Sequence, residues 1–77
     1  MTGPDSNLTD ITAFVRGRRK ERRLSQVKLA ELAGVGPRFL SELERGKPTL
    51  RLDHVNRVLA VFGKRLGITD LPRGDEA

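Results

Sequence analysis

The chain contains no cysteine, no tryptophan and no tyrosine, and it has a single histidine among its 77 residues. Without cysteine there can be no disulfide, and one histidine cannot complete a zinc knuckle, so neither kind of cross-link stabilises the fold. A domain of this size buries only about 60% of its unfolded surface and is therefore marginally stable. We expect a partner subunit to supply part of the missing core area.

Long apolar runs are also missing from the sequence. No stretch approaches the roughly 18 residues that a membrane-spanning helix requires. The N-terminal stretch MTGPDSN has neither the basic start nor the apolar segment of a signal peptide. The sequence therefore predicts a cytoplasmic protein.

Positive charge is the most prominent feature of the composition. Fifteen Lys and Arg outnumber ten Asp and Glu, which gives a formal net charge of +5 and a sequence pI near 10.8. Such an excess favours an anionic partner, and nucleic acid is the first candidate. A binder of single-stranded RNA would present stacking aromatic rings, whereas this chain has only three Phe. Double-stranded DNA is the better match.

The basic run RGRRKERR is open to a second interpretation, as an arm that binds RNA or directs nuclear import. Helical phase argues against it, because Glu21 interrupts the charge and because Arg18 and Arg22 share one solvated face. We favour an exposed helix face that adds nonspecific attraction to DNA.

Apolar residues recur at helical spacing in four stretches, each flanked by capping or breaking residues. The spacing predicts helices over residues 8–23, 26–33, 37–45 and 55–62. We expect the buried face of the second helix to carry Leu29, Ala30, Leu32 and Ala33. The predicted fold class is all-α, a bundle of four to five short helices spanning residues 7–71, with disordered tails at residues 1–6 and 72–77.

The stretch LSQVKLAELAGVGPRFLSELERGK, residues 24–47, joins the second and third predicted helices through a turn that contains glycine. Gly34 can take the positive φ that ends a helix, and Pro37 suits the first position of the next one. Two short helices joined in this way within a basic helical domain form a helix-turn-helix unit, whose second helix lies in the DNA major groove. The outward positions of that second helix are Gly36, Pro37, Arg38, Ser41 and Glu42.

The C-terminal segment KRLGITDL alternates, with Leu66 and Ile68 on one side. This pattern predicts a short strand that has nothing to pair with in its own chain. Two copies could pair across a two-fold axis, and we expect the dimer contacts to include Leu66, Ile68 and Phe62. A frayed tail is the alternative.

The stretch 24–47 resembles the XRE-type, lambda-repressor-like helix-turn-helix regulators, whose pattern has a Ser/Thr-Gln start, Leu-Ala, a Gly-Val turn and a closing Glu-Arg-Gly. Within that family RGRRKERRLSQ, RFLSELERGKPTLRLDHV and GKRLGI are most similar to the HipB-like antitoxins. The resemblance implies a bacterial homodimeric repressor that binds an inverted-repeat operator, associates with the nucleoid through that DNA, and neutralises a HipA-like serine/threonine kinase toxin. A stand-alone phage-type or metabolic repressor is the alternative.

The resemblance also implies residue roles. Gln26 would bond a phosphate and brace the recognition helix, and Arg19 and Glu44 would form a structural salt bridge. From its place near the tip of that helix we expect Arg38 to bond guanine in bidentate fashion. The further candidates for base reading are Ser41, Glu42 and Pro37, of which Glu42 would accept a hydrogen bond from cytosine or simply repel phosphate at wrong sites. The candidates for phosphate contact are Gly36, Arg45, Lys47 and Arg51. A merely solvated loop is the alternative for the last three.

Nothing in the sequence indicates catalysis. His54 has no second metal ligand nearby and no nucleophile at a spacing that suggests a triad. The pair Gly34 and Gly36 is no dinucleotide fingerprint, because no strand precedes it and a third glycine is missing. We expect no catalytic residue, no metal and no cofactor. The competing function class is a pure protein-binding inhibitor of a toxin, and the exposed basic helix tip favours the DNA-binding repressor instead.

Overall fold

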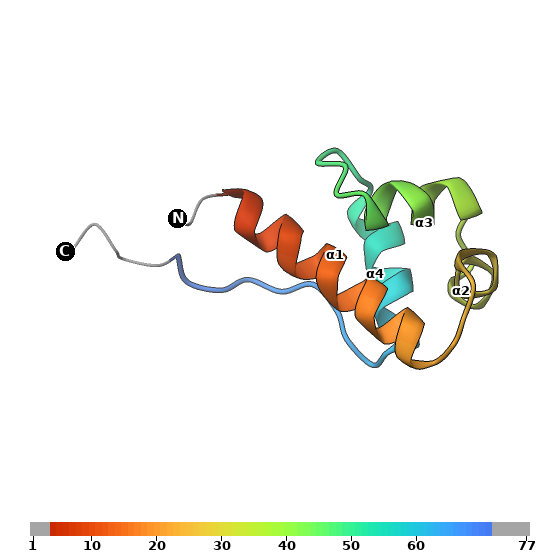
Figure 1. Cartoon of the computed structure of the whole chain (residues 1–77). Helices are drawn as coiled ribbons and strands as arrows, with labels where there is room; N and C mark the ends of the chain where they lie inside the picture. The colour runs from red at the N-terminus through yellow and green to blue at the C-terminus, as the bar shows by residue number, and fades with distance from the viewer. Residues whose placement is uncertain (1–3, 72–77) are drawn as a thin grey trace.

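Four helices make up the regular structure in the computed structural model, which describes residues 4–71 and the side chains of residues 10–71. They are α1 (Pro4–Glu21), α2 (Gln26–Ala33), α3 (Pro37–Glu44) and α4 (Leu52–Val61). Figure 1 shows α2, α3 and α4 gathered around one end of the long α1, and the C-terminal segment running back beside α1. The predicted all-α fold is confirmed for this part of the chain, in which no strand is present.

Helix α1 differs from its predicted range of 8–23 at both ends. It begins at Pro4, where a proline loses no hydrogen bond because the first amides of a helix have no intrahelical partner. It ends at Glu21, because Arg23 takes a left-handed φ of 56° and the chain turns there. Residues 4–6, which were expected in the N-terminal tail, are thus helical, while residues 1–3 and the predicted tail 72–77 lie outside the described residues.

Local signals fix the connection between α2 and α3. The Ser25 hydroxyl accepts a hydrogen bond from the Lys28 amide at 3.0 Å and caps the start of α2. Gly34 ends α2 with a φ of 75°, a conformation that glycine adopts at little cost. The Val35 amide then donates to the Ala30 carbonyl at 3.0 Å, and Pro37 opens α3. This is the predicted helix-turn-helix arrangement.

The core lies where the four helices meet. Its buried apolar residues are Val15, Leu29, Ala30, Ala33, Leu40, Leu43, Val55, Val58, Leu59 and Phe62. Leu32 was expected among them but is 53% exposed, because α2 turns only a narrow face toward its neighbours and Leu32 lies outside that arc. Phe62 is 8% exposed and meets Phe14 edge to face at a centroid distance of 6.1 Å. The Phe62 ring thus fills the core of its own chain, and its part in a dimer interface stays a prediction.

Residues 64–71 follow α4 as an extended segment. The Leu66 amide donates to the Asn56 side-chain carbonyl at 2.7 Å, and the half-buried Leu66 side chain packs against the core. Ile68 and Leu71, by contrast, have fully or largely exposed side chains. Pairing of this segment with a second chain stays a prediction.

Candidate nucleic-acid interface

A buried polar cluster fixes the start of α2 and the end of α3 to α1. The Arg19 guanidinium donates to both Glu44 carboxylate oxygens, at 2.6 and 3.0 Å, and also to the Leu24 carbonyl at 2.8 Å. The Gln26 side-chain amide donates to the same carboxylate at 3.1 Å. Glu44 is only 6% exposed. The structure thus brings together Arg19 and Glu44, and Gln26 joins them as a brace between α2 and α3.

Electrostatics in this cluster favour the charged forms of both partners. Burial raises the pKa of the Glu44 carboxyl, but the hydrogen bonds from Arg19 and Gln26 together outweigh it and hold that pKa below its ordinary value. The hydrogen bond to Glu44 raises the pKa of the Arg19 guanidinium, against an opposing effect of burial. The pair therefore stays ionised at neutral pH.

The outward face of α3 carries the residues that were predicted to read bases. The Arg38 side chain is 93% exposed, Pro37 is exposed and Ser41 is half-buried. Glu42 is different, because its carboxylate faces two neighbouring cations: its Oε2 lies 3.6 Å from Arg38 Nε and 3.5 Å from Lys47 Nζ. Arg38 is thus far more accessible than Lys47, whose side chain is 45% exposed.

Besides Gln26 at the start of α2, the predicted phosphate contacts lie at the two ends of α3, in the loop that follows it and at the start of α4. Gly36 precedes the first helical residue, and Arg45 follows the last one with its side chain exposed. Lys47 is half-exposed beside Glu42. Arg51 is already engaged in a fork with the Asp53 carboxylate, with distances of 2.9 and 3.2 Å, and this pairing is the main reason that the pKa of Asp53 is lowered. Arg51 would have to exchange Asp53 for a phosphate.

Several contacts that support the interface were not predicted. The Arg57 guanidinium of α4 donates to the Gly34 carbonyl at 3.2 Å, so it supports the turn that aims α3. The Thr12 hydroxyl donates to the Leu43 carbonyl at 3.0 Å. Periodicity gives no signal for either contact, because both link positions more than twenty residues apart.

Aromatic rings contact three further side chains near this interface. Phe39 is half-buried and meets the His54 ring edge to face at 5.3 Å, so it packs at the rim of the core. Arg18 and Arg22, expected on a merely solvated face, lie over the Phe14 and Phe62 rings at 5.1 and 5.0 Å. They cover the edge of the core as well as adding charge.

The described residues contain neither a cluster of metal ligands nor a membrane-spanning helix. Residues 10–71 contain no group of three His, Cys, Asp or Glu side chains that could hold a metal ion. None of the helices within residues 4–71 is long and apolar enough to cross a membrane.

Comparison with known proteins agrees with this geometry, which is that of a helix-turn-helix domain. The profile of the helix-turn-helix family matches residues 15–68, and the chain belongs to this family of XRE-type regulators. The chain is 49% identical over 59 residues to the uncharacterized HTH-type transcriptional regulator y4mF of Sinorhizobium fredii, a match that covers 77% of this chain and 78% of the relative.

A solved structure shares the fold. A chain of a toxin-antitoxin module from Streptococcus pneumoniae superimposes with a TM-score of 0.76 at 34% identity. The match covers 87% of this chain and 74% of that one. The family and the relative both indicate a DNA-binding transcriptional regulator.

Proposed function

We propose that the protein is a homodimeric repressor that binds an inverted-repeat operator and serves as the antitoxin of a HipBA-like system. It represses its own operon and neutralises a HipA-like kinase. The observation that carries the DNA-binding part is the placement of α3: a helix braced at its C-terminal end by Arg19, Glu44 and Gln26, with Arg38 exposed at its N-terminal end. Such a helix can enter a major groove without rearrangement of the fold.

Within this function, Arg38 reads guanine, and Ser41 with the exposed Pro37 contacts neighbouring base edges. The residues that meet phosphates are Gln26, Gly36, Arg45, Lys47 and Arg51. The amide groups at the start of α2 add a further anion site beside Gln26. These contacts place the protein in register on the duplex, and the α3 contacts select the sequence.

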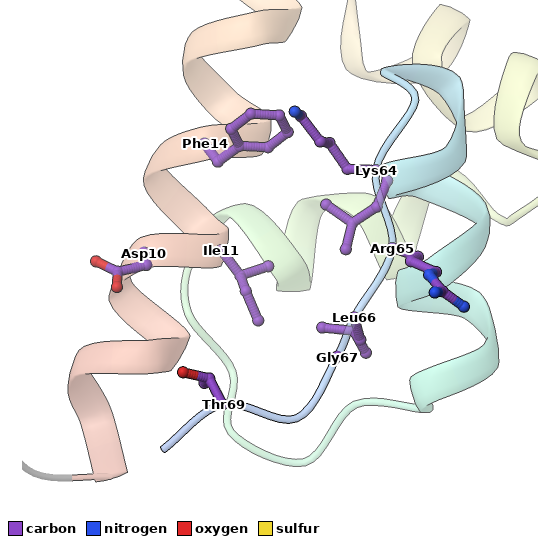
Figure 2. Close-up of a pocket in the computed structure, with 9 residues that line it drawn as sticks. Asp10, Ile11, Phe14, Lys64, Arg65, Leu66, Gly67 and Thr69 are labelled. Atoms are coloured by element: carbon purple, nitrogen blue, oxygen red, sulfur yellow. The ribbon is translucent and has the colours of Figure 1, made fainter. Parts of the chain in front are cut away.

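Dimerisation uses the extended segment 64–71. Figure 2 shows a groove between α1 and this segment, with Ile11 of α1 facing Leu66 and the Phe14 ring lying beside Lys64. The groove has a volume of about 500 Å³ and a largely apolar lining, and Ile68 and Leu71 stand exposed where the same segment continues. A second copy can place its own Ile68 and Leu71 side chains over the groove, and the reciprocal contact forms a two-fold dimer. Leu66 lines this groove and so contributes to the surface that the second copy would cover.

The antitoxin part rests on the similarity to a toxin-antitoxin module together with the sequence stretches that resemble HipB-like antitoxins. The second candidate function is a stand-alone XRE-type repressor, which the relative described only as a transcriptional regulator favours. The two candidates share the DNA-binding face and differ in whether a kinase binds.

A mobility shift and a footprint on the DNA upstream of the coding sequence test the DNA-binding function. We expect two protected half-sites about 34 Å apart, as two recognition helices on one face of the duplex require. Half a palindrome should bind far more weakly than the whole, and a half-turn of added spacer should abolish tight binding. Equal binding of half and whole sites at every salt concentration would refute the dimeric repressor.

A separate experiment tests the antitoxin part. The proposal requires a kinase-like gene in an adjacent reading frame, and the protein should co-purify with its product and suppress its autophosphorylation. Failure to bind such a kinase, combined with a normal operator footprint, would favour the stand-alone repressor.

A further inference from the structure

The Glu42 carboxylate has an arrangement that base reading does not explain. One of its oxygens, Oε2, lies within 3.6 Å of both Arg38 Nε and Lys47 Nζ. The Glu42 side chain is 22% exposed, whereas those of Arg38 and Lys47 are 93% and 45% exposed. A sheltered negative charge thus sits between two accessible positive charges on the face proposed to meet DNA.

Backbone geometry fixes this arrangement. Arg38 and Glu42 are four residues apart on α3, so their side chains lie on the same face of the helix. The Lys47 amide donates to the Glu42 carbonyl at 3.1 Å, which folds the loop back over the end of α3. Lys47 is therefore held beside Glu42 by the main chain as well as by charge.

Nonspecific DNA and operator DNA would change the contacts among Glu42, Arg38 and Lys47 in different ways. A complex held by phosphates alone pulls both cations toward the backbone of the duplex and leaves the carboxylate unpaired near negative charge, which is unfavourable. In an operator complex Arg38 turns to a base edge, and the carboxylate can accept a hydrogen bond from a cytosine amino group. The carboxylate therefore weakens the first complex more than the second.

We infer that Glu42 is a specificity-determining residue that restrains Arg38 and Lys47 and thereby lowers the affinity for nonspecific DNA. This inference rests on the proposed DNA-binding function and deepens it. Glu42 contributes to specificity chiefly by destabilising the complex with nonspecific DNA, whereas Arg38 contributes by stabilising the complex with the operator. The two residues act together through their ion pair.

The substitution Glu42→Gln tests this role because it keeps the size of the side chain and removes the charge. Glu31→Gln is the matched control, because Glu31 forms a similar ion pair with Lys28 at 3.3 Å but projects from α2 with 71% of its side chain exposed. Fluorescence anisotropy with an operator duplex and a random duplex of equal length, at several salt concentrations, gives the affinities. Thermal melting confirms that each variant is folded.

We expect Glu42→Gln to raise the affinity for the random duplex about three- to tenfold and to steepen its salt dependence by about one unit per subunit. Operator affinity should stay constant or fall, so the ratio of the two affinities should shrink. Glu42→Asp keeps the charge and should preserve most of the ratio. Glu31→Gln should change both affinities by a similar, smaller factor.

The possible failures are distinguishable. If the unaltered protein does not prefer its operator, the proposed function fails. If it does prefer the operator and Glu42→Gln leaves that preference intact, or changes both affinities as Glu31→Gln does, only the role of Glu42 is refuted.

Discussion

The region from α2 to α3 and the segment after α4 differ in how the chain is held and in the polarity of the side chains that they expose. In the first, a capped helix, a glycine turn and a buried ion pair hold the chain, and the exposed residues of α3 are largely polar or charged. In the second, the chain is extended, and two large apolar side chains, Ile68 and Leu71, point into solvent. A rigid polar face suits a ligand of fixed shape such as a DNA groove. An exposed apolar segment suits a surface that becomes complete only with another chain.

The largest expected effect concerns the rigidity of the first region. Glu44→Gln leaves the mostly buried Arg19 guanidinium without its counter-charge, and we expect a loss of about 3–5 kcal/mol in the free energy of unfolding. Urea denaturation followed by circular dichroism measures it. Glu21→Gln removes the exposed partner of Arg18 and should change stability by less than about 1 kcal/mol. Equal effects of the two substitutions would show that the buried cluster does not hold the fold together.

The second prediction concerns the apolar segment. Ile68→Asp adds a charge at a fully exposed position, so the isolated chain should keep its helix content. The dimer should dissociate, and operator affinity should fall about a hundredfold or more, because the two half-sites are then bound independently. Sedimentation velocity measures the mass. Leu66→Ala is the contrasting variant, since Leu66 packs on its own core and its loss should lower the melting temperature as well. A dimer that survives Ile68→Asp would place the interface elsewhere.

The third prediction separates base reading from phosphate contact within the polar face. Arg38→Ala should reduce the discrimination between operator and random DNA by about 1–3 kcal/mol, the usual size for one bidentate base contact. Lys47→Ala should weaken both DNAs alike and make the salt dependence shallower by about one unit. Competition binding at several salt concentrations distinguishes them. Loss of affinity for both DNAs equally on Arg38→Ala would mean that Arg38 contacts phosphate.

The smallest expected effect is a pH dependence in the buried cluster. Because the pKa of Glu44 is lower in the folded chain than the unfolded value of about 4.3, its contribution is fully present above that pH. The contribution is lost as the pH falls through the folded pKa, when the carboxyl becomes protonated. Denaturation between pH 3 and pH 7 should therefore show a steeper acid loss in the unaltered protein than in Glu44→Gln, and parallel curves would contradict the assignment.

Much of the fold and the outline of the site could be predicted because their signals are local. Ser25 caps a helix, Gly34 ends one and Pro37 begins the next, and each acts within a few residues of chain. Resemblance to the XRE-type family added the Arg19 and Glu44 pair, which no periodicity reveals. The extent of α1 was missed at both ends, because a proline start and a left-handed Arg23 are weak signals in a charged, polar stretch.

The helix-turn-helix unit, the basic charge and the outward position of Arg38 follow from short-range spacing and composition, so the amino-acid sequence alone predicts them. The tertiary structure decided that Phe62 belongs to the core of its own chain and that Arg57 supports the turn at Gly34. It also decided that Glu42 faces Lys47 as well as Arg38. Burial and ion pairing depend on which segments meet in space. Local sequence patterns do not reveal contacts between side chains that are far apart along the chain.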